Sequence, residues 1–146
     1  MNTNTRYLHD NIVNYAKALV KTLPPKLEVC TFVCTGSEAN DLALRMARTY
    51  TGRKDIICLH SAYHGHTTSL IEISPYKYEG KGGFDKVKTT YKVPAPDIYR
   101  GEHKGGNAGL EYAKDVVKAI EESQRNGTGI AAMIAESILG CAGQIP

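Results

Sequence analysis

The chain of 146 residues lacks any strong excess of charge, with 18 Lys and Arg residues against 15 Asp and Glu residues. The net charge of +3 is spread along the sequence without a basic stripe, which excludes dedicated nucleic-acid binding. No run approaches the roughly 18 apolar residues that a membrane span needs, and residues 1–13 lack the apolar core of a secretory signal. We therefore expect a soluble globular domain with no nucleic-acid or membrane partner.

Cysteine is scarce as well, and none of the four cysteines belongs to a Cys-x-x-Cys motif. This number excludes a disulfide scaffold and argues against a zinc or redox site. Each cysteine lies in or beside an apolar stretch, where a free thiol packs as a small hydrophobic side chain: Cys30, Cys34, Cys58 and Cys141. The sequence thus predicts a reducing compartment. The mitochondrial matrix and the cytoplasm fit equally well, because the sequence shows no Arg-rich leader that would decide between them.

Apolar residues alternate along the chain between two patterns, one typical of amphipathic helices and one typical of buried strands. Helical spacing predicts helices over residues 11–23, 36–51 and 110–126, with a shorter one over 65–73. Leu42, Met46 and Tyr50 fall on the expected apolar face of the second helix. Apolar runs without polar alternation predict buried strands at residues 29–34, 56–59 and 130–135. This order predicts an α/β fold, a doubly wound domain with a mostly parallel sheet and flanking helices.

Residues 75–107 follow neither pattern and are rich in Lys, Gly and Pro. A connection of this length is too long for an ordinary link between a strand and a helix. We predict a functional loop or a surface excursion, with one short strand near residues 91–93.

Polar groups follow three of the expected strands at their carboxyl ends, where α/β folds collect their ligands: residues 35–37, residues 63–65 and Glu136. The turn at Gly36 and Ser37 opens a helix, and its unpaired N–H groups suit a phosphate. Thr35 and Glu38 form a capping box, which would also satisfy this helix end without a ligand. On this segment alone, both interpretations stay open.

The segment around Tyr63 and His64 offers an aromatic ring that can lie flat against a planar heterocycle, and Gly65 leaves room beside it. His60, His64 and His66 invite a metal interpretation, but they span a strand and a loop without a carboxylate motif, so we predict no metal site. Glu136 ends an apolar strand. Its carboxylate either reaches the site, where it could hold a cation or tune a cofactor, or lies in solvent.

Taken together, blocks along nearly the whole chain resemble fold-type I pyridoxal-phosphate enzymes, in particular class III aminotransferases. These blocks are residues 4–9 (NTRYLH), 36–45 (GSEANDLALR), 62–66 (AYHGH), 69–77 (SLIEISPYK), 96–101 (PDIYRG) and 130–136 (IAAMIAE) with 143–145 (GQI). Within the class, they are most similar to phospho-lyases acting on ethanolamine phosphate or phosphohydroxylysine, also described as alanine-glyoxylate aminotransferase 2-like proteins. The block at residues 69–77 favours this subgroup over general transaminases.

The resemblance implies pyridoxal 5′-phosphate as cofactor and a small amine or amino acid as substrate, used by a phospho-lyase or a transaminase. Gly36 and Ser37 would bind the cofactor phosphate. Tyr63 would stack on the pyridine ring, His64 would shape the pocket, and Glu136 would lie near the ring and the substrate.

The same resemblance also concerns other positions. Arg6 and Tyr7 would line the substrate site, and the parent enzyme would be a homodimer or homotetramer. Thr35 stands where relatives usually carry Ser and keeps the hydroxyl. Cys141 follows Gly140 where many aminotransferases of the class have a carboxylate, so their Glu-dependent substrate binding is not carried over.

The main departure from the family is an absence of catalytic residues. The family's cofactor-linked lysine and the aspartate that pairs with the pyridine nitrogen lie beyond the position that matches Pro146, and no lysine here occupies a matching motif. We therefore expect residues 1–146 to form an incomplete large, cofactor-binding domain, with the N-terminal segment and the C-terminal half of the parent absent. The alternative is a catalytically silent truncated fragment or pseudoenzyme that keeps only a phosphate-binding turn. A small nucleotide-binding module is a third and more distant possibility.

Overall fold

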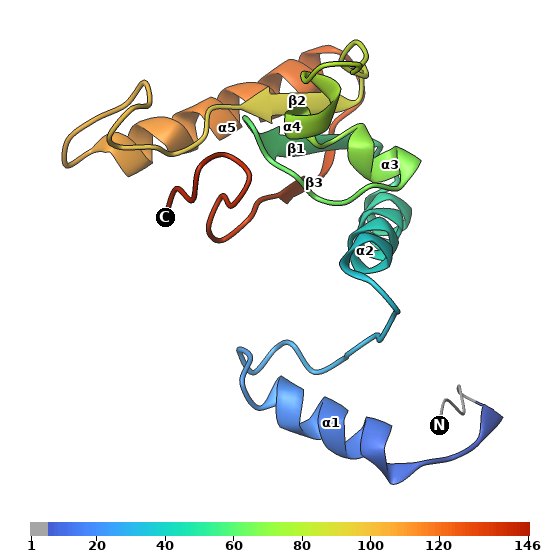
Figure 1. Cartoon of the computed structure of the whole chain (residues 1–146). Helices are drawn as coiled ribbons and strands as arrows, with labels where there is room; N and C mark the ends of the chain where they lie inside the picture. The colour runs from blue at the N-terminus through green and yellow to red at the C-terminus, as the bar shows by residue number, and fades with distance from the viewer. Residues whose placement is uncertain (1–5) are drawn as a thin grey trace. The chain divides into compact units, whose positions relative to one another are not determined.

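The computed structural model describes residues 6–146, which divide into one unit up to Val33 and a second unit, Cys34–Pro146, each described by itself. The first unit contains helix α1, Asp10–Val20 (Figure 1). The His9 side chain caps this helix by accepting a hydrogen bond from the Asn11 N–H at 3.1 Å. The helix predicted over residues 11–23 is confirmed, although it ends at Val20.

The strand predicted over residues 29–34 is wrong, because this segment has no regular secondary structure. Within residues 6–146, no strand pairs with it, and Val29 is 90% exposed. A strand obtains its hydrogen bonds from a neighbouring strand, so a run of β-branched residues without that neighbour stays irregular. The Phe32 ring instead contacts the Tyr15 ring of the same unit, with the centroids 5.3 Å apart.

The second unit is built on a parallel sheet of strand order β2-β1-β3. The strands are β1, Asp55–Leu59, β2, Thr90–Val93, and β3, Ile130–Ile134. Ile57 of β1 pairs with Tyr91 of β2 on one side and with Met133 of β3 on the other. All five residues of β1 are buried, as expected for a central strand of a parallel sheet. The strands predicted at residues 56–59, 91–93 and 130–135 are confirmed.

Four helices accompany this sheet: α2, Gly36–Thr51, α3, Thr68–Ile71, α4, Pro75–Tyr78, and α5, Ala108–Arg125. Both long helices are predicted from the sequence and confirmed, and Gly52 ends α2 with a left-handed φ of +67°. The single helix predicted over residues 65–73 is instead the short helix α3, and α4 follows it with Pro75 at its first position. None of the helices within residues 6–146 is both long and apolar enough to cross a membrane.

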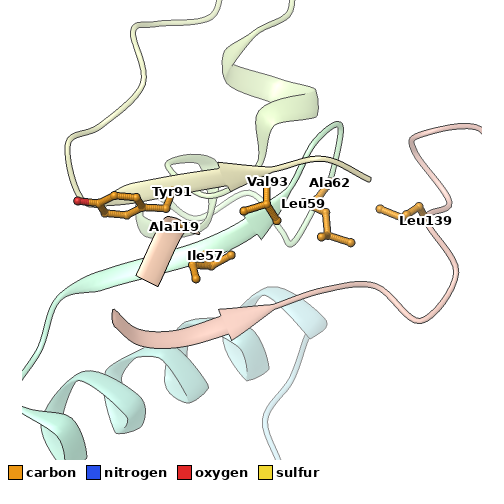
Figure 2. Packing of buried hydrophobic residues seen from close by; sticks show 7 residues of the cluster. All are labelled: Ile57, Leu59, Ala62, Tyr91, Val93, Ala119 and Leu139. Carbon is orange, nitrogen blue, oxygen red and sulfur yellow. The ribbon is translucent and has the colours of Figure 1, made fainter. Parts of the chain in front are cut away.

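The core lies on both faces of β1, because successive strand residues point to opposite sides. Figure 2 shows the cluster on one face, which joins the strands to α5: Ile57, Leu59, Ala62, Tyr91, Val93, Ala119 and Leu139. The cluster on the other face joins β1 to α2 and α3: Leu44, Ile56, Cys58, Leu70 and Ile73. Helices thus cover both faces of a parallel sheet, as the sequence predicts for this fold class.

A buried carboxyl side chain, that of Asp55, lies at the amino end of β1. Asp55 is only 1% exposed and accepts hydrogen bonds from the Ser123 hydroxyl at 2.7 Å and from the Thr128 hydroxyl. The Ser123 oxygen in turn accepts the Gly129 N–H at 2.8 Å. This network joins the start of β1 to the end of α5, and hydroxyl donors satisfy the buried carboxyl group.

Candidate functional site

A cleft of about 540 Å³ opens where β1 and β3 end, beside the first turn of α2. It brings together the segments that the sequence places at the carboxyl ends of strands, including the five predicted cofactor-binding residues Gly36, Ser37, Tyr63, His64 and Glu136. The same cleft is lined by Thr35, Asn40, Gly65, His66, Ile134, Ala135 and Ser137. The parallel strands β1 and β3 bring Tyr63, His64 and Glu136 to one edge of the sheet, and the first turn of α2 adds Gly36 and Ser37, although no strand precedes them.

The first turn of α2 lines the cleft through Gly36 and Ser37. The Thr35 hydroxyl accepts the Glu38 N–H at 3.1 Å, and the Glu38 carboxylate accepts the Cys34 N–H at 2.7 Å. This is a variant of the predicted capping box in which Glu38 reaches one residue further back. Among the hydrogen bonds of residues 6–146, none uses the N–H groups of Gly36 or Ser37. The helix end is therefore capped but keeps donors for an anion.

Gly65 brings the loop after β1 into close contact with α2. Its φ is +136°, and a Cβ atom there would lie 2.5 Å from Leu70 Cδ1 and 2.7 Å from Ser37 Oγ. The next residue, His66, donates its N–H to Ser37 Oγ at 3.3 Å. A larger residue would strain the backbone here and press against Leu70 and Ser37, so this position favours glycine.

A tight turn after β1 leads into the loop that lines the cleft. Ser61 has a left-handed φ of +60°, and its hydroxyl bonds with His60 Nδ1 at 2.9 Å. Two residues later, the Tyr63 N–H donates to Glu136 Oε2 at 3.3 Å, which links the loop to the end of β3. The half-buried Tyr63 ring packs edge-on against Tyr76, with centroids 6.3 Å apart.

His64 is the buried member of the site and is only 6% exposed. Its N–H donates to Ser74 Oγ at 2.9 Å, and its carbonyl accepts from Asn40 Nδ2 at 2.8 Å. Burial lowers the pKa of His64, and the negative charge of Glu136 opposes this shift in part, so the imidazole is neutral at neutral pH. Its buried Nε2 atom has no hydrogen-bond partner within residues 6–146.

The structure also shows site residues that the sequence analysis misses. Asn40 lines the cleft and donates a hydrogen bond to the His64 carbonyl. Ser74, which does not line the cleft, accepts a hydrogen bond from the His64 N–H. Both interactions join residues distant in the chain, so no periodicity or capping pattern indicates them.

The histidines have separate roles in the structure. His60 bonds with Ser61 and lies 4.0 Å from the Glu79 carboxylate, whereas His64 is buried and His66 is exposed. In the part of the chain that the structure describes, no group of three or more His, Cys, Asp or Glu residues is placed to hold a metal ion.

Arg6 and Tyr7 belong to the first unit, where both are exposed. Because that unit is described by itself, their predicted role at the substrate site stays a prediction.

Comparison with known proteins identifies the family. The model of the class-III aminotransferases matches residues 2–146. The chain is 44% identical over 150 residues to an alanine–glyoxylate aminotransferase 2-like protein of Drosophila melanogaster, an alignment that covers 99% of this chain and 30% of the fly protein. The chain spans about a third of the length of the curated relatives it matches.

Solved structures give the same result at the level of the fold. A phospholyase from Arthrobacter in complex with phosphoethanolamine is 32% identical, with a TM-score of 0.79 over 93% of this chain and 32% of that chain. A taurine:2-oxoglutarate aminotransferase from Bifidobacterium kashiwanohense, in complex with PLP and glutamate, is 27% identical, with a TM-score of 0.75 over 97% of this chain and 33% of the other. The parallel sheet and its helices therefore match part of the fold-type I transaminase structures, and the chain belongs to the class III aminotransferase family, whose enzymes use pyridoxal phosphate.

Proposed function

We propose that the cleft binds pyridoxal 5′-phosphate and that the chain is part of the large domain of an enzyme acting on phosphorylated amines. The observation that carries the proposal is the meeting of unpaired helix N–H groups, a hydroxyl and a half-buried aromatic ring in one cleft. The N–H groups and the hydroxyl suit the phosphate of this cofactor, and the aromatic ring suits its flat pyridine ring.

The phosphate fits the first turn of α2. The N–H groups of Gly36 and Ser37 would donate to it, and the positive end of the helix dipole favours its charge. Because Ser37 Oγ already accepts the His66 N–H, its own proton is available to donate to the phosphate. Gly65 keeps this cradle open, since a Cβ atom there would displace Ser37.

The ring of the cofactor fits the wall formed by Tyr63 and His64. The half-buried Tyr63 ring offers a face for stacking. The His64 Nε2 atom has no hydrogen-bond partner within residues 6–146, so it can still form a hydrogen bond next to the cleft. Glu136 adds a carboxylate after the end of the neighbouring strand β3, where it accepts the Tyr63 N–H of the loop. Bound pyridoxal phosphate supplies an electron sink for the substrate's α carbon, and these residues would hold and orient it.

We propose a phospho-lyase, an enzyme that eliminates phosphate from an amino-alkyl phosphate such as ethanolamine phosphate. The phospholyase structure from Arthrobacter and the block at residues 69–77 support this choice. A transaminase is the second candidate, because the family contains both activities. Phosphoethanolamine given to the complete enzyme should release phosphate and ammonia. Amino transfer to a keto acid without phosphate release would favour the transaminase.

We also propose that residues 1–146 are one part of the large domain and that this chain alone is catalytically silent. The relatives it matches are about three times as long, which supports this view. Borohydride reduction with pyridoxal phosphate should then leave no stoichiometric adduct at a single lysine of this chain. Such an adduct at one site would contradict the proposal. Sequencing the transcript beyond Pro146 would show whether a family-like aspartate and lysine follow.

For the complete enzyme, we propose a homodimer or homotetramer in the mitochondrial matrix or the cytoplasm. The four cysteines of residues 1–146 are free thiols, which suits a reducing compartment. Light scattering of the complete enzyme would measure the number of subunits.

A further inference from the structure

Ser74 lies behind the wall of the cleft that contains Tyr63 and His64. It is completely buried, with 0% of its surface exposed, and it directly precedes Pro75, the first residue of α4. Its side chain makes no cap hydrogen bond to α4 and does not line the cleft. Any effect of Ser74 on a ligand therefore passes through another residue.

The Ser74 hydroxyl connects His64 to helix α3. Its oxygen accepts the His64 N–H at 2.9 Å, and its proton goes to the Leu70 carbonyl at 2.6 Å. From the other side, Asn40 of α2 donates to the His64 carbonyl at 2.8 Å. Side chains thus satisfy both main-chain polar groups of His64, where a strand would use a neighbouring strand.

These bonds set the path of the main chain at the wall of the cleft. The hydrogen bond that the Tyr63 N–H donates to the Glu136 carboxylate is long, at 3.3 Å, and its acceptor is a side chain that follows the neighbouring strand β3. The shorter bonds at His64 hold the loop more firmly. Because the direction of a side chain follows from its main chain, they also orient the Tyr63 ring and the His64 imidazole.

We propose that Ser74 is a positioning residue: its hydrogen bond to His64 holds Tyr63 and His64 where they contact the ring of the bound cofactor. The identity of that ligand rests on the proposed function above. The N–H groups of Gly36 and Ser37 belong to α2 and do not depend on this bond. Ser74 should therefore affect the binding of the ring and leave the binding of the phosphate unchanged.

The experiment compares two probes on the 146-residue chain: pyridoxamine 5′-phosphate, which has no aldehyde to react with lysines, and inorganic phosphate. In Ser74→Ala, we expect the dissociation constant of pyridoxamine 5′-phosphate to rise about fivefold or more and that of inorganic phosphate to stay within about twofold. Amide hydrogen exchange at His64 should accelerate about tenfold, because its N–H loses its acceptor.

Ser123 provides a matched control at the other end of the sheet. It is also 0% exposed, accepts a main-chain N–H at 2.8 Å and donates to an oxygen at 2.7 Å. Ser123→Ala should destabilise the chain at least as much as Ser74→Ala and leave pyridoxamine 5′-phosphate binding within about twofold. If Ser74→Ala does not fold, Ser74→Cys keeps the size of the side chain and replaces the hydroxyl acceptor with a weaker sulfur acceptor, with an expected weakening of pyridoxamine 5′-phosphate binding of about threefold.

The outcomes separate this inference from the proposed function. If the wild-type chain binds pyridoxamine 5′-phosphate and Ser74→Ala binds it equally well, the inference about Ser74 is wrong while the function stands. The inference is equally wrong if Ser123→Ala weakens binding as much as Ser74→Ala, since the effect then reflects general stability. If the wild-type chain does not bind pyridoxamine 5′-phosphate, the proposal that this cleft holds the cofactor is wrong, and the ligand role of Ser74 with it.

Discussion

The close approach at Gly65 leads to a prediction about the stability of the chain. In Gly65→Ala, the new methyl group would lie 2.5 Å from Leu70 Cδ1 and 2.7 Å from Ser37 Oγ, and 3.2 Å from the Ser37 Cα atom. Leu70 is completely buried and Ser37 is part of α2, so neither can move freely. The backbone at φ +136° adds strain, because side chains other than glycine rarely adopt it.

The magnitude follows from these terms. Strain at an unfavourable φ costs about 1–3 kcal/mol, and overpacking a tight site costs about 1–3 kcal/mol. We expect Gly65→Ala to lower the free energy of unfolding by about 3 kcal/mol, a large part of the about 5–15 kcal/mol typical of a domain. Urea denaturation followed by far-ultraviolet circular dichroism measures this change as a lower transition midpoint.

Gly36 provides the matched control, because it lines the same cleft and an added Cβ atom meets nothing within 4 Å. Gly36→Ala should change the free energy of unfolding by less than about 0.5 kcal/mol, since alanine suits the first turn of a helix. If Gly65→Ala unfolds at the same urea concentration as Gly36→Ala and the wild-type chain, the close contact between the loop and α2 does not exist.

Further predictions concern titration, reactivity and the buried network. Burial lowers the pKa of His64, so the unfolded chain takes up this proton at a higher pH than the folded chain does, and the free energy of unfolding falls as the pH drops below about 6.5. In His64→Gln, the free energy of unfolding measured by urea denaturation should fall less between about pH 7.5 and about pH 5.5 than in the wild-type chain. An equal fall in both would contradict this prediction. Burial raises the pKa of the Cys58 thiol to about 12, so iodoacetamide at about pH 8 should alkylate the exposed Cys34 and Cys141 while Cys58 reacts only after denaturation, as peptide mass mapping would show. Asp55→Ala removes the acceptor of the Ser123 and Thr128 hydroxyls and should lower the free energy of unfolding by about 2 kcal/mol; a change below about 0.5 kcal/mol would mean that the network adds nothing.

Local signals in the sequence predict most of the second unit. Thr35 and Gly52 mark both ends of α2, and the apolar runs at residues 56–59 and 130–135 predict β1 and β3. Once the strands are known to be parallel, the edge that collects Tyr63 and Glu136 follows from topology, whereas Gly36 belongs to α2, and the strand expected before it does not form. These features depend on neighbours in the chain and on the parallel direction of the strands, and the sequence predicts both.

Features that depend on tertiary partners are predicted less well. The strand expected at residues 29–34 fails because no neighbouring strand in the described chain pairs with it. On α2, the expected apolar face is also partly wrong: Leu44 is buried, whereas Met46 is 58% exposed and Tyr50 is 93% exposed. Helical spacing shows which residues share a face, but the packing partner decides which face is buried. Ser74 is missed for a similar reason, since its bond to His64 depends on the path of a loop.

We propose above that the cleft at the carboxyl ends of the strands is a site for the phosphate and ring of pyridoxal phosphate. Amide chemical shifts of the 146-residue chain, titrated with pyridoxamine 5′-phosphate, test it most directly. We expect saturable shifts at Gly36, Ser37, Tyr63 and His64, with only the first two responding strongly to inorganic phosphate. Shifts confined to other parts of the chain, or no saturable shifts with pyridoxamine 5′-phosphate, would contradict it.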